Sequence, residues 1–155
     1  MAIETLILFD KQTTEQTLEA ALEAFAFAHN APVERVGRRY NVATPVGLYT
    51  LDRMSDSRRD FYGSEYGMAG THSFYCRASK DIPDGYISFD KECLAIVGNV
   101  ISIEARSGIL MLRNWETPIL EKKGQRLILR DLPLGRTAEF LASLPKEIDV
   151  ECIDE

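Results

Sequence analysis

The sequence contains few residues of the kinds that bind metals or form disulfides. It has two histidines and three cysteines, and no pair among Cys76, Cys93 and Cys152 has CxxC spacing. Neither histidine lies where it would complete a zinc site with a cysteine, so the sequence predicts no metal and no cofactor. Unpaired, widely spaced cysteines are typical of reduced thiols, so we expect the protein in the cytoplasm.

Long apolar runs are also missing. No run approaches the ~20 residues that a membrane-spanning helix needs, and the first residues lack the basic and apolar regions of a secretory signal. We therefore expect a soluble protein with no membrane contact. Hydrophobic residues make up 45% of the chain and charged residues 27%, which is ordinary for a folded protein, and the length predicts one domain over residues 1–155.

The chain lacks an excess of positive charge. Its formal net charge is −6, although residues 35–80 hold eight basic and four acidic residues between two net negative segments. Nucleic-acid binding needs a dominant basic surface, so a nucleic-acid partner is not expected. A net negative protein is suited to meet a basic protein, because opposite potentials speed their encounter.

No catalytic motif with a known spacing is present. There is no GxSxG or HExxH sequence, and the glycines of residues 63–70 are not spaced as in a phosphate-binding loop. His72 and Cys76 fall on one face of a predicted strand, but about 13 Å apart at ~3.3 Å per residue. We therefore expect no catalytic residues, and an enzyme is the less favoured class.

What the chain does contain is a series of short β-rich segments. Residues 84–132 predict an antiparallel meander, in which Gly98 and Asn99 form a two-residue hairpin turn and residues 109–112 a central strand. Helical periodicity predicts one long helix over residues 13–29 and a short one over residues 136–144. The fold class is therefore α+β, with a mostly antiparallel, twisted sheet of six to eight strands.

Residues 52–71 follow neither period and predict a long surface loop. The loop gathers residue types that anchor protein interfaces: Arg58, Arg59, Tyr62, Tyr66 and Met68. Two alternatives remain open. The arginines can pair with neighbouring acids, and some apolar side chains, with Phe61 and Met68 favoured, can pack beneath the loop.

Two groups of acids suggest further contact surfaces. Glu15, Glu19 and Glu23 recur every four residues on the predicted long helix, and Asp149 and Glu151 alternate along a predicted terminal edge strand. Each group is either an ordinary solvated face or a ridge that binds a basic partner.

Together these features favour a non-enzymatic protein-binding module, as a monomer or homodimer. By analogy with a class of proteins, we hypothesise a bacterial immunity-type inhibitor that neutralises a cognate toxin, such as a basic toxin domain, by binding it. The expected contacts are Glu15, Glu19, Glu23, Arg58, Arg59, Tyr62, Tyr66, Met68, Asp149 and Glu151. The alternative is a small enzyme or ligand-binding domain whose site lies between the sheet and the 52–71 loop, with His72 among its polar groups.

Overall fold

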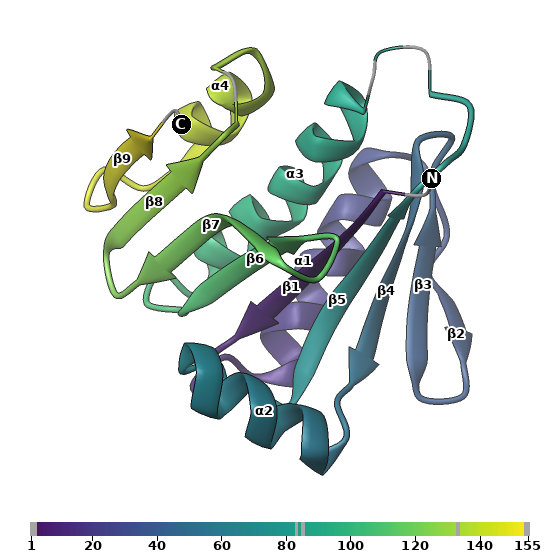
Figure 1. Cartoon of the computed structure of the whole chain (residues 1–155). Helices are drawn as coiled ribbons and strands as arrows, with labels where there is room; N and C mark the ends of the chain where they lie inside the picture. Colours follow the sequence, from purple (N-terminus) through teal and green to yellow (C-terminus); the bar gives the residue numbers. More distant parts are fainter. Residues whose placement is uncertain (1–2, 83, 85, 133, 154–155) are drawn as a thin grey trace.

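The structure is a computed structural model that describes residues 3–82, 84, 86–132 and 134–153. All of the described strands belong to one sheet, in the order β2-β3-β4-β5-β1-β6-β7-β8-β9 (Figure 1). The strands are β1 (Glu4–Phe9), β2 (Glu34–Val36), β3 (Arg39–Ala43), β4 (Gly47–Arg53), β5 (His72–Ala78), β6 (Ile109–Arg113), β7 (Thr117–Lys123), β8 (Arg126–Arg130) and β9 (Asp149–Ile153). The helices are α1 (Glu15–Ala28), α2 (Asp56–Tyr66), α3 (Ile87–Ile103) and α4 (Leu134–Ser143).

The α+β class with a mostly antiparallel sheet is confirmed. Only β8 and β9 are parallel among the described neighbours. The described part of the chain has nine strands rather than six to eight, and four helices rather than two. Residues 109–112 do form a central strand: β6 pairs with β1 and β7, and its four apolar side chains are buried on both faces.

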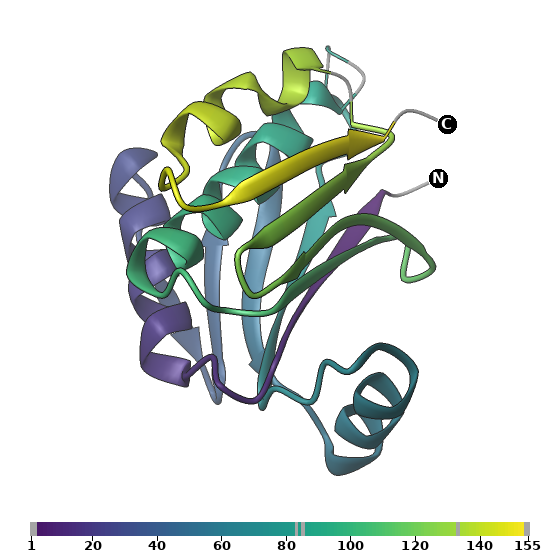
Figure 2. The same cartoon turned by 90° about the vertical axis from the view of Figure 1, so that its left-hand side faces the viewer.

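Three helices cover one face of the sheet. Figure 2 shows α1, α3 and α4 on one side and α2 alone on the other, at one end. The main core lies between the sheet and the three helices, and it includes Phe9, Phe25, Phe74 and Phe89. A smaller cluster lies beneath α2. In the described part of the chain, no helix covers the rest of the second face (Figure 2).

The long N-terminal helix lies close to where its periodicity places it. Thr14 caps α1, because its hydroxyl accepts a hydrogen bond from the Thr17 N–H, and Leu18, Leu22 and Phe25 are buried. The short C-terminal helix, α4, also forms near its predicted range.

The predicted meander over residues 84–132 is wrong in its first half. Residues 87–103 form one helix, α3, and Gly98 and Asn99 lie inside it rather than in a hairpin turn. Phe89, Cys93 and Val97 are buried at helical spacing. The β-branched residues of this segment favour a strand locally, but its helical face fits the core better. The meander proper consists of β6, β7 and β8.

The predicted loop over residues 52–71 contains a helix. Residues 52 and 53 finish β4, and α2 then begins after Ser55, whose hydroxyl accepts a hydrogen bond from the Arg58 N–H. Gly67 ends α2 in the left-handed conformation at φ 71°. Tyr62 is the only buried residue of this polar helix, so no apolar period reveals it.

Two buried charges tie the helical layer to the sheet. Lys122 of β7 is fully buried and donates hydrogen bonds of 2.6, 2.7 and 2.6 Å to the carbonyls of Ala105, Ser107 and Gly124. Burial lowers the pKa of Lys122. Asp90 of α3 is 2% exposed and binds two arginines, one on β6 and one on α4.

The two ends of the sheet differ in pairing. The β2–β3 hairpin turns at Gly37, whose φ is 63°, and all three residues of β2 are exposed. At the other end, β9 is the edge strand that the alternating acids predict. Within the described residues, no helix has the length and apolar character needed to cross a membrane.

Candidate functional site

The open face of the sheet carries a groove of about 410 Å³ beside α2. Strands β2 to β5 supply most of its lining, α2 supplies Arg58, and the turn between β6 and β7 supplies Trp115. We call it the open-face groove. Its lining residues are Val36, Arg39, Asn41, Leu48, Thr50, Asp52, Arg58, Ser73, Tyr75 and Trp115.

Trp115 adopts an unusual backbone conformation. Asn114 and Trp115 occupy the two central positions of the β6–β7 turn at φ 51° and 70°, and the Glu116 N–H donates to the Arg113 carbonyl at 3.2 Å. This geometry suits asparagine and glycine, whereas a bulky residue there costs on the order of 1–3 kcal/mol. The strained turn brings the only tryptophan of the chain to the groove.

The indole is held by neighbouring side chains. Its Nε1–H donates to Glu4 Oε2 at 2.7 Å, and its ring lies 5.4 Å from the ring of Tyr75. Hydrogen bonds from Tyr75 and Trp115 lower the pKa of Glu4. Burial, and then the hydrogen bond to Glu4, raise the pKa of Tyr75 to about 12. Trp115 is nevertheless 36% exposed, so its fixed ring is accessible from solvent.

Two arginines add positive charge to the groove. The guanidinium carbon of Arg58 lies 5.5 Å from the Trp115 ring and 5.8 Å from the Tyr62 ring, which is cation–π distance. Arg39 pairs with Asp52 through Nε at 3.2 Å and is largely exposed. Leu48 and Val36, which are 39% and 59% exposed, add apolar area to the floor. Trp, Tyr and Arg are the residues most enriched at the energetic centres of protein interfaces.

The acids of α1 do not face this groove. Glu15 Oε1 lies 3.4 Å from His72 Nε2, and a hydrogen bond to Glu19 raises the pKa of Tyr40. Glu23 is exposed on the helix. Two of the three acids therefore already have partners within the chain.

The acids of β9 lie at the far edge of the sheet. Glu151 pairs with Arg126 at 2.8 Å, and Asp149 is exposed beside it. Strand β9 is separated from the groove strands by β1 and β6 to β8. The two predicted acidic groups therefore form separate surfaces.

The residues expected on the 52–71 loop spread over several sites. Arg58 lines the groove, while the Arg59 guanidinium donates to the Ala69 carbonyl at 3.3 Å. Tyr62 and Met68 are buried beneath α2, and the partly buried Tyr66 packs beside them. The expectation that Met68 is buried is confirmed, whereas Phe61, at 55% exposed, is not.

The polar groups of the alternative ligand site do not converge. His72 lies on the helix-covered face of β5, with its ring nitrogens near Thr71 and Glu15. Cys76 follows four residues later on the same strand, and both side chains are buried. Among the described residues, no group of three or more histidine, cysteine or acidic side chains is arranged to hold a metal ion.

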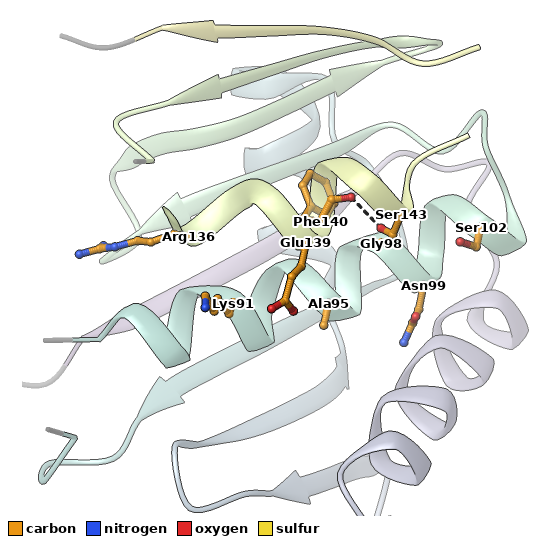
Figure 3. Close-up of a pocket in the computed structure, with 9 residues that line it drawn as sticks. All are labelled: Lys91, Ala95, Gly98, Asn99, Ser102, Arg136, Glu139, Phe140 and Ser143. Carbon is orange, nitrogen blue, oxygen red and sulfur yellow. Dashed lines mark hydrogen bonds between the residues drawn. The ribbon is translucent and has the colours of Figure 1, made fainter. Parts of the chain in front are cut away.

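A second hollow, of about 210 Å³, lies between α3 and α4 (Figure 3). Its lining includes Lys91, Asn99, Arg136, Glu139 and Ser143. The polar groups are partly engaged elsewhere: Arg136 binds Asp90 at 2.6 Å, and the Ser143 hydroxyl donates to the carbonyl of Phe140. This hollow presents fewer free anchoring groups than the open-face groove.

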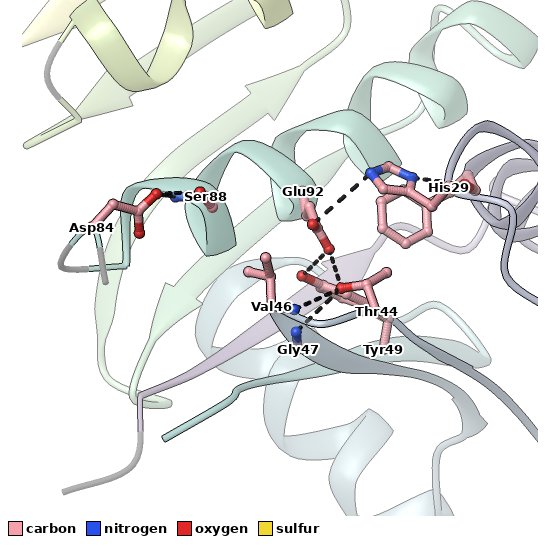
Figure 4. A network of polar contacts seen from close by, with 9 residues as sticks. His29, Thr44, Val46, Gly47, Tyr49, Asp84, Ser88 and Glu92 are labelled. Atoms are coloured by element: carbon pink, nitrogen blue, oxygen red, sulfur yellow. Dashed lines mark hydrogen bonds and ion pairs between the residues drawn. The ribbon is translucent and has the colours of Figure 1, made fainter. Parts of the chain in front are cut away.

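A polar network joins α3 to the sheet and to α1 (Figure 4). Glu92 Oε1 accepts hydrogen bonds from the Thr44 and Tyr49 hydroxyls at 2.6 and 2.9 Å, and Glu92 Oε2 lies 3.9 Å from His29 Nε2. Burial raises the pKa of Tyr49 far above its ordinary value, so the phenol stays protonated. The network satisfies a half-buried carboxylate and thereby fixes the helix on the sheet.

Sequence reasoning missed most of the groove. Arg58 is the only predicted contact residue among its lining residues. Thr50 and Ser73 alternate with core residues along β4 and β5, so the sequence pattern predicts these two strands. Which residues share a face of the sheet depends on the strand order, which the pattern does not give. Asn114 and Trp115 offered one signal, since asparagine often begins such a turn.

Comparison with known proteins gives little further information. No protein-family model matches the chain. No curated protein matches it either. A solved structure described as the CdiA-CT/CdiI toxin and immunity complex from Burkholderia pseudomallei matches with 14% sequence identity and a TM-score of 0.41, over 75% of this chain and 95% of that chain. A likeness of this size establishes neither a shared fold nor a shared function.

Proposed function

We propose that the chain is a protein-binding module that docks a cognate protein onto the open-face groove. One observation carries the proposal: Trp115 occupies a strained left-handed position that holds its ring, still accessible to solvent, beside Tyr75 and Arg58. Backbone strain persists where the rest of the structure supports it, and it is concentrated at functional sites. Trp, Tyr and Arg are enriched among the residues that contribute most binding energy near the centres of protein interfaces.

The finer proposal is an immunity-type inhibitor, which neutralises a toxin by covering it. The groove supports it through its open shape, because a flat partner surface can reach the rings of Trp115 and Tyr75 together. The acidic overall charge supports it as well, since a net charge of −6 would speed encounter with a basic toxin domain. The exposed acids Glu23 and Asp149 are candidates for that long-range attraction rather than for the central contact.

The test uses the protein product of the open reading frame beside this gene as the candidate toxin. The two proteins are co-expressed, and growth and complex formation are measured for wild type, Trp115→Ala and Tyr75→Ala. We expect rescue by wild type and a loss of affinity of about 2 kcal/mol or more in each variant, as at central interface residues. Cys152 on β9 is exposed and distant from the groove in strand order, so it offers an attachment point for a surface-binding assay.

Matched controls separate the groove from the acidic surfaces. Glu23→Gln and Glu151→Gln each remove one charge outside the groove. If either control abolishes binding while Trp115→Ala does not, the docking surface is an acidic ridge and the groove assignment is wrong. If the neighbouring product is not toxic and binds none of the variants, the inhibitor proposal is wrong.

A small-molecule site in the same groove is the second candidate. The hollow lies between the sheet and the 52–71 segment, where that alternative places it, and Arg58 lines it. Tyr62 is buried beneath α2 and His72 lies beside Glu15, so neither side chain is available to a ligand in the groove, which argues against a small-molecule site. A shift in Trp115 fluorescence with small anionic metabolites, in the absence of any protein partner, would favour it.

A further inference from the structure

The charge of the groove is opposite to that of the whole chain. The protein carries −6 overall, but the groove is lined by two arginines and one acid. Asp52 is already paired with Arg39. Among the lining residues, the charge left over is therefore that of Arg58, and it is positive. The Glu4 carboxylate is not a lining residue, and it accepts hydrogen bonds from Tyr75 and Trp115.

The Arg58 guanidinium is positioned without an anion. It lies against the rings of Trp115 and Tyr62, and among the described residues it has neither an ion pair nor a side-chain hydrogen bond. Tyr62 lies one helical turn after Arg58 and is buried in the cluster beneath α2. Its burial holds this part of the helix against the sheet. A guanidinium offers five N–H donors in a planar fork that matches a carboxylate. Cation–π contacts with two rings hold the guanidinium beside the groove before any partner arrives.

The surroundings define what kind of group fits beside the fork. Leu48 and Val36 give exposed apolar area on the floor, and Tyr75 and Trp115 give flat rings. The hydroxyl of Thr50 already donates to Asn41 at 2.8 Å. An occupant therefore meets the Arg58 cation beside apolar side chains and two aromatic rings.

From these contacts we infer that the groove binds an aspartate or glutamate side chain of the partner protein, flanked by apolar residues, with its carboxylate held by Arg58. This inference rests on the proposed protein-binding function and names the chemistry of its central contact. Arg39 lines the same groove, but it is already paired with Asp52 and is therefore not needed for this contact. The partner can still be basic overall, since long-range attraction and the central contact involve different surfaces.

The test selects displayed random twelve-residue peptides on the immobilised wild-type protein. The affinity of the enriched peptides is then measured by the fluorescence of Trp115 and, for the variant that lacks it, by calorimetry. The variants are Arg58→Met, Arg58→Lys, Trp115→Ala and the control Arg126→Met. Arg126 is an exposed arginine on β8, paired with Glu151 near the far edge of the sheet, so its loss removes the same charge outside the groove.

The inference expects peptides that share an acidic residue next to an apolar one. Arg58→Met should weaken them about ten- to hundredfold, the range for a hydrogen bond to a charged group, while Arg126→Met should change little. The affinity of the peptides for Arg58→Lys should lie between those for wild type and Arg58→Met, because lysine keeps the charge but lacks the planar set of N–H donors. Replacing the acidic residue of the peptide by its amide should remove the sensitivity to Arg58.

Other outcomes overturn the inference in distinguishable ways. Peptides without an acid, or peptides that bind Arg58→Met as well as wild type but lose affinity for Trp115→Ala, refute the carboxylate contact and leave the docking groove intact. Peptides indifferent to both residues, or no enrichment, remove the groove as a docking surface. A twelve-nucleotide single strand that binds more tightly than any peptide would assign the fork to phosphate. A dimer in light scattering that Arg58→Met dissociates would assign the groove to a second copy of the chain.

Discussion

Exchanging Trp115 for glycine and for alanine tests the strain on which the proposed function depends. Both variants lose the same indole contacts with Glu4, Tyr75 and Arg58, so their difference reports the backbone alone. An L-residue in the left-handed region costs roughly 1–2 kcal/mol, whereas glycine is free of that cost but loses about 0.4–1 kcal/mol through the entropy of the unfolded chain. At φ 70°, Trp115→Gly should therefore be more stable than Trp115→Ala by about 1 kcal/mol.

Urea unfolding followed by far-ultraviolet circular dichroism measures the difference, since neither variant keeps a tryptophan. A difference of that size corresponds to roughly 2–4 °C in Tm for a chain of this length. The same pair at Glu116, the next residue, is the control, because Glu116 is not among the residues with positive φ. There the order should reverse, with alanine the more stable. If alanine is at least as stable as glycine at position 115, the turn is not strained and the argument from strain fails.

Three further predictions concern the groups that fix the fold and the groove. Lys122→Met should destabilise the protein by about 3 kcal/mol or more in urea unfolding, because three carbonyls lose their donor in a fully buried site; a loss below 1 kcal/mol would contradict this. Asp90→Asn should cost about 3–5 kcal/mol, because two arginines lose their shared carboxylate, and an unchanged denaturation midpoint would disprove it. The lowered pKa of Glu4 means that its contribution to stability is present above its unfolded value of 4.5 and is lost as the pH falls through the lower folded value; Trp115 fluorescence should show a step there that Glu4→Gln abolishes.

The sequence was most informative where one period dominates. Leu18, Leu22 and Phe25 repeat at helical spacing behind a threonine cap, and α1 forms there. The four apolar residues from Ile109 to Leu112 predict a strand covered on both faces, and β6 is that strand. In both cases local propensity and burial agree, so no knowledge of the neighbours is needed.

The predictions were wrong where local propensity and burial conflict, or where the sequence has no apolar periodicity. In α3, Val100 and Ile101 favour a strand, but the side chains that bury themselves recur at three and four residues. In α2 only Tyr62 is buried and Phe61 is exposed, so no apolar period forms, and only the cap at Ser55 and the left-handed Gly67 mark the helix. The capping signals were present in the sequence, but they carry less weight than periodicity.

The groove could not be predicted because it depends on strand order. Arg39 and Asp52 become neighbours only when β3 pairs with β4, and Tyr75 meets Trp115 only because β1 separates β5 from β6 by a single strand. Arg58 was predicted as a contact residue from its residue type. Its orientation depends on α2, which was predicted as a loop. The prediction of partner-binding acids on α1 and β9 stays untested.

The position of β1 has a consequence for how the chain is made. Residues 4–9 are synthesised before both of their neighbours in the sheet, and they hydrogen-bond to β5 on one side and β6 on the other. The Glu4 N–H finds its acceptor on Asn114, 110 residues later. Until the β6 segment has left the ribosome, one edge of the apolar strand β1 has no hydrogen-bonding partner. Unpaired strand edges of this kind make incompletely folded chains prone to aggregate. We therefore expect folding to be slow and late, and the yield of native protein to depend on what shields this first strand while the rest of the chain is still being translated.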